Sequence, residues 1–289
     1  PLVDDVLSMR VVGYSSSDGG YVDNVLGSSF SGSYDNADIV DEDFNTYDVT
    51  GGRIAVLWNI SDDWSALMSH VTENSELEGS WDTDPDLGDY KITRFVDEMR
   101  DDDWYSSAFT LKGDLGFADL SATVTHYGRD IVYLWDNHAY SQYKDAYYGY
   151  GLYDTDYTRS NIFNDQEQQR DAAEIRLVSK GDSKLLWMAG AYWEDVYDEW
   201  YYGAGYPDYM STDAAYYANY WACYYANYYD FVDCPIDTTV GYSDTFKRSV
   251  EQTAVFGEVA YDVTDKLTLT AGMRWSEFKR QTYNRDAFP

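Results

Sequence analysis

Aromatic side chains gather in one segment that also holds both cysteines. Residues 197–246 contain thirteen tyrosines and no lysine or arginine, and an eight-residue unit nearly repeats at 216–223 (YYANYWAC) and 224–231 (YYANYYDF). Tyrosine combines flat apolar area with a hydroxyl group, which suits surfaces that bind sugars, aromatic ligands or cations. The alternative is a drifting tandem duplication whose rings pack on one another. We expect ligand contacts from Tyr216, Tyr217, Tyr220, Trp221, Tyr224 and Tyr225.

A second aromatic-rich segment, residues 131–167, is expected to be a long loop. It could add to the same binding surface or be solvated, and we take Trp135, Tyr140, Tyr147 and Tyr148 as its candidate ligand contacts. The cysteines, Cys223 and Cys234, favour a local disulfide over free thiols. The three histidines lie elsewhere in the sequence, which disfavours a zinc site built on these cysteines.

No enzyme or metal motif stands out. The chain contains no Gly-x-Ser-x-Gly elbow, phosphate-binding loop or HExxH sequence. The acidic run at 101–103 could hold calcium only with further oxygen ligands from other loops, and we interpret it as a solvated loop end. We expect no enzyme activity, no metal site and no cofactor.

The charge of the chain excludes one class of partner. A net charge of −32 would repel phosphates, so we expect no nucleic-acid partner. Such acidity indicates either solubility in a salty environment or an outer surface that gathers cations. The longest apolar runs, 54–58 and 185–193, are far shorter than the ~18–20 residues of a spanning helix.

The elements that must position these residues are strands with a period of two. Residues 267–275 alternate Leu, Leu, Ala, Met and Trp against a polar row, over a length typical of strands that cross an outer membrane. Arg10, Arg176 and Arg274 lie opposite such apolar rows. We predict an all-β fold, an antiparallel meander of nine strands, at 6–14, 51–60, 64–71, 104–112, 118–127, 168–179, 184–194, 250–261 and 267–276, with a possible short strand at 90–96.

Long and short connections alternate along this meander. The long ones, 15–46, 72–103, 131–167 and 197–246, alternate with turns of about three to five residues. Outer-membrane barrels have short periplasmic turns and long extracellular loops, whereas a sandwich has no reason to place every long loop at one end. An odd strand count cannot close a bacterial barrel, so we expect residues 1–289 to be part of a larger barrel domain.

Several segments resemble one family in sequence order. LSMRVVG at 7–13 with DGGYVDN at 18–24, GGRIAVLW at 51–58, GDLGFADL at 113–120, EIRL at 174–177 with WMAG at 187–190, and EQTAVFGE at 251–258 with LTAGMRW at 269–275 are similar to the barrel of TonB-dependent receptors, in the iron-complex branch. The resemblance implies a 22-stranded transmembrane β-barrel, closed by a plug domain and located in the outer membrane of a Gram-negative bacterium.

The same resemblance implies the partners and the activity. Such receptors bind a scarce nutrient outside, most often an iron–siderophore complex, and admit it when the inner-membrane TonB motor complex acts on the plug. Arg10, Arg176 and Arg274 would then face the lumen and meet the plug, and the apolar rows would face outer-membrane lipid. The sequence departs from the family in lacking the plug, its TonB-contacting box and the later strands. A passive porin and a secreted acidic, glycan-binding β-sandwich adhesin are the alternatives.

Overall fold

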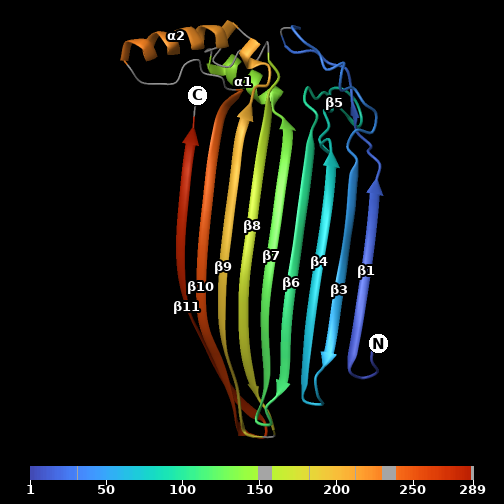
Figure 1. Cartoon of the computed structure of the whole chain (residues 1–289), viewed down its shortest axis with the longest axis vertical. Coiled ribbons are helices and arrows are strands. Elements are labelled where there is room, and N and C mark those ends of the chain that lie inside the picture. Colours follow the sequence, from blue (N-terminus) through green and yellow to red (C-terminus); the bar gives the residue numbers. More distant parts are fainter. Residues whose placement is uncertain (31, 149–157, 182, 212, 230–238, 288–289) are drawn as a thin grey trace.

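One long antiparallel sheet forms the body of the molecule (Figure 1). The computed structural model describes residues 1–289 except 31, 149–157, 182, 212, 230–238 and 288–289. Nine strands pair in the order β1-β3-β4-β6-β7-β8-β9-β10-β11, each with its neighbour along the meander. Their bounds are β1 Leu7–Asp18, β3 Tyr47–Asn59, β4 Trp64–Glu78, β6 Met99–Asp114, β7 Ala118–Asp136, β8 Asn161–Ser179, β9 Leu185–Gly205, β10 Val240–Thr264 and β11 Leu267–Ala287.

The register divides the strand residues between two faces. Residues paired directly across an antiparallel sheet lie on the same face, and successive residues alternate. One continuous row of paired, mostly apolar residues therefore crosses the whole sheet: Leu7, Trp58, Ala66, Leu111, Ala122, Ile175, Ala191, Val255 and Trp275. We call the face that carries this row the band face.

The apolar band crosses the strands diagonally. On β11 it lies on the turn side of this row, from Leu267 to Trp275, whereas on β1 it continues beyond the row toward the long connections, from Leu7 to Val11. The register row runs perpendicular to the strands, and the apolar band crosses this row at an angle. The strands are therefore tilted relative to the direction of the band. Tilted strands are a requirement of closed barrels.

The opposite face carries the arginines. Arg10, Arg176 and Arg274 all fall on it, because Arg10 pairs with Ala55 and Arg176 shares a row with Gly190, Phe256 and Arg274. We call it the arginine face.

Every long connection lies at one end of the sheet and every short turn at the other (Figure 1). Together the long connections form what we call the loop layer, which holds β2 (Asp23–Asn24), β5 (Lys91–Ile92), α1 (His138–Tyr148), a short 3-10 helix η1 (Tyr209–Ser211) and α2 (Asp213–Tyr229). Buried apolar residues of the loop layer include Val22, Ile92, Phe95, Tyr206 and Ala215. The sheet thus exposes apolar side chains, while the loop layer has a small core of its own.

The strand prediction is confirmed in number and order, but several boundaries were wrong. The strands run 12 to 25 residues rather than about ten. β7 continues to Asp136 and β8 begins at Asn161, so much of the segment expected to be a loop at 131–167 is strand. β9 likewise reaches Gly205. These extensions carry charged and polar residues on both faces, and cross-strand hydrogen bonds hold them where the hydrophobic alternation stops.

The loop predictions also missed two helices. α1 and α2 form inside segments expected to be irregular, and the possible strand at 90–96 is only the two-residue β5, paired in parallel with β2. Across the described residues, neither of these helices nor any other is long and apolar enough to cross a membrane.

Candidate functional site

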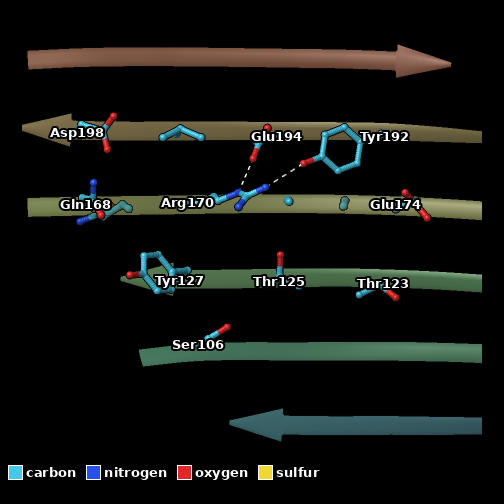
Figure 2. Close-up of a pocket in the computed structure, with 14 residues that line it drawn as sticks. Ser106, Thr123, Thr125, Tyr127, Gln168, Arg170, Glu174, Tyr192, Glu194 and Asp198 are labelled. Atoms are coloured by element: carbon cyan, nitrogen blue, oxygen red, sulfur yellow. Dashed lines mark hydrogen bonds and ion pairs between the residues drawn. The ribbon is translucent and has the colours of Figure 1, made fainter. Parts of the chain in front are cut away.

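A shallow trough lies on the arginine face of the sheet. Its volume is about 940 Å³, and residues of β6, β7, β8 and β9 line it. Figure 2 shows the Arg170 guanidinium lying between Glu194 and Tyr192 of the neighbouring strand. Arg170 pairs with the Glu194 carboxylate and donates to the Tyr192 hydroxyl at 3.4 Å. Thr123, Thr125, Tyr127, Gln168 and Asp198 complete the polar lining.

Arginine–carboxylate pairs continue on either side of the trough. Asp198 accepts a hydrogen bond from Arg248 Nε at 2.8 Å. Asp102 accepts from Arg129 at 2.8 and 2.5 Å, a two-point contact, and from Arg100 at 2.6 Å. Forked guanidinium–carboxylate contacts are strong and hold both side chains in fixed positions. This face therefore offers guanidinium, carboxylate, amide and hydroxyl groups to a polar partner. Among the described residues that line the trough with Ser106, none is a histidine or a cysteine.

Two of the arginines predicted to face the lumen share one aromatic ring. The guanidinium carbons of Arg176 and Arg274 lie 5.8 and 5.4 Å from the centroid of Phe256. Gly190 gives this ring its space, because a Cβ at position 190 would lie 2.3 Å from Phe256. Arg10 lies on the same face but on the first strand, remote from this cluster in the strand order.

Buried asparagines organise the part of the loop layer above β1 to β6. Asn24 Oδ1 accepts from the Arg94 backbone N–H at 2.8 Å, and Asn36 donates to the Arg94 carbonyl at 3.0 Å. Asn45 Oδ1 accepts from the backbone N–H groups of Tyr21 and Val22 at 2.7 and 2.8 Å. Side-chain amides thus satisfy backbone groups that irregular chain would otherwise bury unpaired. The connections 19–46 and 79–98 consequently form one unit.

Asp136 joins this unit to the start of α1. It lies at the loop end of β7, beyond the apolar band, and its carboxylate accepts from the backbone N–H groups of Phe95 at 2.7 Å, Val96 at 3.1 Å and His138 at 2.9 Å. Burial raises the pKa of Asp136 to about 6, against the opposing effect of these N–H donors. The carboxyl group therefore bridges two connections that lie far apart in sequence.

His138 is buried beside it and is kept neutral. Desolvation lowers the pKa of His138 to about 4. The Tyr34 hydroxyl donates to the Thr158 carbonyl at 2.9 Å and lies 2.6 Å from His138 Nδ1. That hydroxyl has only one hydrogen, so its donation to Thr158 is compatible with the neutral Nδ1–H tautomer of His138. The ring of Phe95 packs against His138 with centroids 4.3 Å apart.

The predicted aromatic contacts fall on three different elements. Trp135 is a strand residue of β7 on the arginine face, not a loop residue, and contacts Tyr133 with ring centroids 6.0 Å apart. Tyr140 is exposed on α1. The six predicted contacts at 216–225 all lie exposed on α2. The prediction thus combined residues that the structure distributes over β7, α1 and α2.

Part of the prediction falls outside the described residues. Tyr147 and Tyr148 belong to α1, but the positions of their side chains are not described. Cys223 is disulfide-bonded on α2, and its predicted partner Cys234 lies among the undescribed residues 230–238. These assignments remain predictions.

Sequence reasoning missed the central residues of the trough, although a signal for Arg170 existed. Arg170, Glu174 and Arg176 have the same parity on one strand, so the alternation that places Arg176 also places Arg170. Asp198 was missed because it fell in a segment predicted to be a loop. A local sequence signal existed for Asp136. It lies two residues before the start of α1 at His138, and an Asp side chain often accepts a hydrogen bond from the backbone two residues further on.

Comparison with known proteins gives a result only at the level of structure. No protein-family model matches the chain, and no curated protein matches it. The whole chain superposes on the ferric yersiniabactin uptake receptor FyuA from Yersinia pestis with a TM-score of 0.67 and 13% identity, and on FpvAI from its complex with pyocin S2 with a TM-score of 0.54 and 8% identity. It spans 37% and 36% of the lengths of those two chains.

At this identity the likeness concerns the fold. The neighbours are TonB-dependent siderophore receptors, and the complete meander aligns with their structures. The chain therefore has the fold of a barrel-wall segment of TonB-dependent receptors, in agreement with the resemblance that its sequence motifs show.

Proposed function

We propose that this chain forms part of the wall of an outer-membrane, energy-coupled receptor that takes up a scarce nutrient, most commonly an iron–siderophore complex. One observation carries the proposal. A nine-stranded meander presents an apolar band on one face and a polar, arginine-rich face on the other, with every long connection at the same end. Only a wall between lipid and an aqueous interior uses both faces in this way.

In this proposal the band face contacts outer-membrane lipid and the arginine face lines the lumen of a 22-stranded barrel. The trough around Arg170 and the arginines Arg10, Arg176 and Arg274 would meet carboxylates of the receptor's plug domain and water. The TonB motor complex of the inner membrane would act through that plug. The protein would lie in the outer membrane of a Gram-negative bacterium.

The loop layer would meet the ligand first. Exposed aromatic residues on α1 and α2 would supply contact area, and the unit fixed by Asn24, Asn36 and Asp136 would hold the neighbouring loops in place. The iron complex would be cargo rather than a cofactor, and no catalytic step is needed. The structural neighbours are receptors, which favours uptake over the porin and adhesin alternatives.

Growth under iron limitation tests this function. A strain lacking the gene for the full-length protein should grow poorly on ferric siderophores as the iron source, and the intact gene should restore growth. The protein should appear in the outer-membrane fraction and require detergent for extraction. Normal growth of the deletion strain on every siderophore tested, or extraction in plain buffer, would contradict the proposal.

A further inference from the structure

Helix α2 has two halves of opposite character. Its six aromatic residues from Tyr216 to Tyr225 follow the spacing i, i+1, i+4, i+5, i+8 and i+9, which places them within one half of the helix surface. The small residue Ala215 lies on the other half and is 1% exposed. An amphipathic helix normally turns its large apolar residues toward the protein. Here the described aromatic half faces solvent.

The exposure of these rings is high and uniform. The six side chains are 52–66% exposed: Tyr216, Tyr217, Tyr220, Trp221, Tyr224 and Tyr225. Their mutual contacts are mostly edge to face, with centroids 5.4 Å apart for Tyr220 and Trp221 and 5.9 Å for Trp221 and Tyr224. Each edge-to-face contact occupies one face of one ring of the pair and leaves the opposite face of that ring uncovered by the contact. The exposed parts of the ring faces present the negative side of the ring quadrupole to a cation.

The sequence that flanks α2 carries charge of one sign. The sequence has no lysine or arginine between Lys184 and Lys247, a stretch that includes Asp208 and the first residue of α2, Asp213. Arg159, a cation of the loop layer, contacts Asp208 at 3.0 Å and Asp38 at 3.5 Å. An anion approaching the rings would meet carboxylates with no free guanidinium or ammonium group in that stretch, whereas a cation would be attracted both by the carboxylates and by the ring faces.

We propose that the aromatic half of α2 binds a cationic ligand, and that the iron complex taken up by this receptor carries a net positive charge. This inference rests on the proposed uptake function and deepens it, because it selects among iron complexes by charge. The occupant follows from charge complementarity between an exposed aromatic surface, in a stretch of sequence without lysine or arginine, and a ligand that bears an ammonium group.

A charge series of one iron complex tests the inference. The probes are a linear ferric trihydroxamate with a free terminal ammonium group, its neutral N-acetyl derivative and its anionic N-succinyl derivative, which share the same iron centre. Retention of radioactive iron is measured on outer-membrane vesicles that contain the full-length protein. We expect the cation to bind best and the anion worst, with an affinity ratio on the order of tenfold at low salt. Added salt should reduce this ratio.

Single substitutions assign the effect to α2. Trp221→Ala should remove most of the preference for the cation, while Trp221→Phe should retain much of it because a ring face remains. Tyr21→Ala removes a tyrosine of similar exposure elsewhere in the loop layer and should leave the series unchanged. Equal retention of the three complexes, a reversed order or no retention overturns the inference. A growth defect of the deletion strain on ferric siderophores would leave the uptake function standing in each of those cases.

Discussion

The two faces of the sheet are built from the same strands but distribute charge in opposite ways. Of the strand arginines in the described residues only Arg285 lies on the band face, and the arginine face carries the rest: Arg10, Arg53, Arg100, Arg129, Arg170, Arg176, Arg248, Arg274 and Arg280. Above its apolar band, the band face is acidic and carries Asp101, Asp103, Asp130, Asp165, Glu167, Asp171, Asp195 and Glu199. Strand alternation makes this separation possible at every second residue.

The two faces differ in how the charges of their carboxylates are neutralised. On the arginine face, the nearly buried carboxylates of Asp102 and Asp198 pair with arginines from adjacent strands. On the band face, four carboxylates stand directly opposite one another in a single row: Asp103, Asp130, Glu167 and Glu199. Lys247 pairs with Glu199 at one end of this row. Like charges placed opposite each other are destabilising, so the middle of the row depends on water and dissolved ions.

The largest difference between the faces should appear at the centre of the apolar band. Val124 is 52% exposed on the band face, and its neighbour Thr125 lines the trough. Val124→Arg should cost about 2–4 kcal/mol because it places a charge against the hydrocarbon, whereas Thr125→Arg should cost less than about 1 kcal/mol. Urea unfolding of the full-length protein in lipid vesicles measures both. Equal costs would show that the two faces have been assigned wrongly.

The loop layer adds a third environment, in which burial has the largest effect on the charge states of His138 and Asp136. His138 has a folded pKa of about 4 against an ordinary value of 6.5. The stability that its neutral form gives the loop layer is therefore fully present above pH 6.5 and is lost as pH falls toward 4. Asp136 changes the stability of the loop layer with pH in the opposite direction. Its folded pKa of about 6 exceeds the ordinary 3.8, so the loop layer gains stability as pH falls from 6 to 4. The two effects should nearly cancel between pH 6 and 4.

Removing either Asp136 or His138 should reveal how the other group changes the stability of the loop layer with pH. In Asp136→Asn, the loop layer should lose up to about 3 kcal/mol between pH 6.5 and 4, because a tenfold difference in proton affinity corresponds to about 1.4 kcal/mol. In His138→Asn, it should instead become more stable as pH falls over the same range. Amide hydrogen exchange of residues 93–98, corrected for the intrinsic pH dependence, measures both slopes. Parallel slopes in the two variants would refute the opposing assignment.

Ion pairs should be worth more on the arginine face. Asp198→Ala leaves Arg248 without its nearly buried partner, and we expect a loss of about 1–3 kcal/mol. Glu251→Ala breaks the exposed band-face contact with Lys279, whose atoms are 3.4 Å apart, and should cost less than about 1 kcal/mol. Unfolding titrations at low and high salt compare the two. The idea fails if the Glu251 variant loses as much stability as the Asp198 variant.

The smallest expected effect is a gain. Asp130→Asn removes one charge from the middle of the acidic row, and it should stabilise the protein by about 0.2–1 kcal/mol at low salt. The gain should shrink as salt screens the remaining carboxylates. The matched change Asp102→Asn on the arginine face should destabilise instead, because Arg100 and Arg129 lose their shared partner. A loss of stability in both variants, measured by the same unfolding titrations, would mean that the acidic row is neutralised by groups outside the sheet.

Elements fixed by local sequence patterns could be predicted from the sequence, whereas elements fixed by contacts between distant residues could not. The strands around Ala122, Ile175 and Leu269 could be read from alternation because each apolar residue reports its own face. The upper halves of β7 and β8 could not, since Asp130, Glu167 and their neighbours lack apolar alternation and are held by the ladder of adjacent strands. The helices were missed because tyrosine has no strong helix preference and the repeat suggested irregular chain.

The sequence by itself determined the meander, its alternation of long and short connections, and the side of the sheet on which Arg10, Arg176 and Arg274 lie. Those properties depend on a period of two and on turn residues, which are local. Only the tertiary structure decided that Arg170 sits between Glu194 and Tyr192, that Asp136 joins the loop around Phe95 to α1, and that the rings of α2 face solvent. Contacts of this kind join residues distant in sequence, and their formation depends on strand register and burial, which no short stretch of sequence encodes.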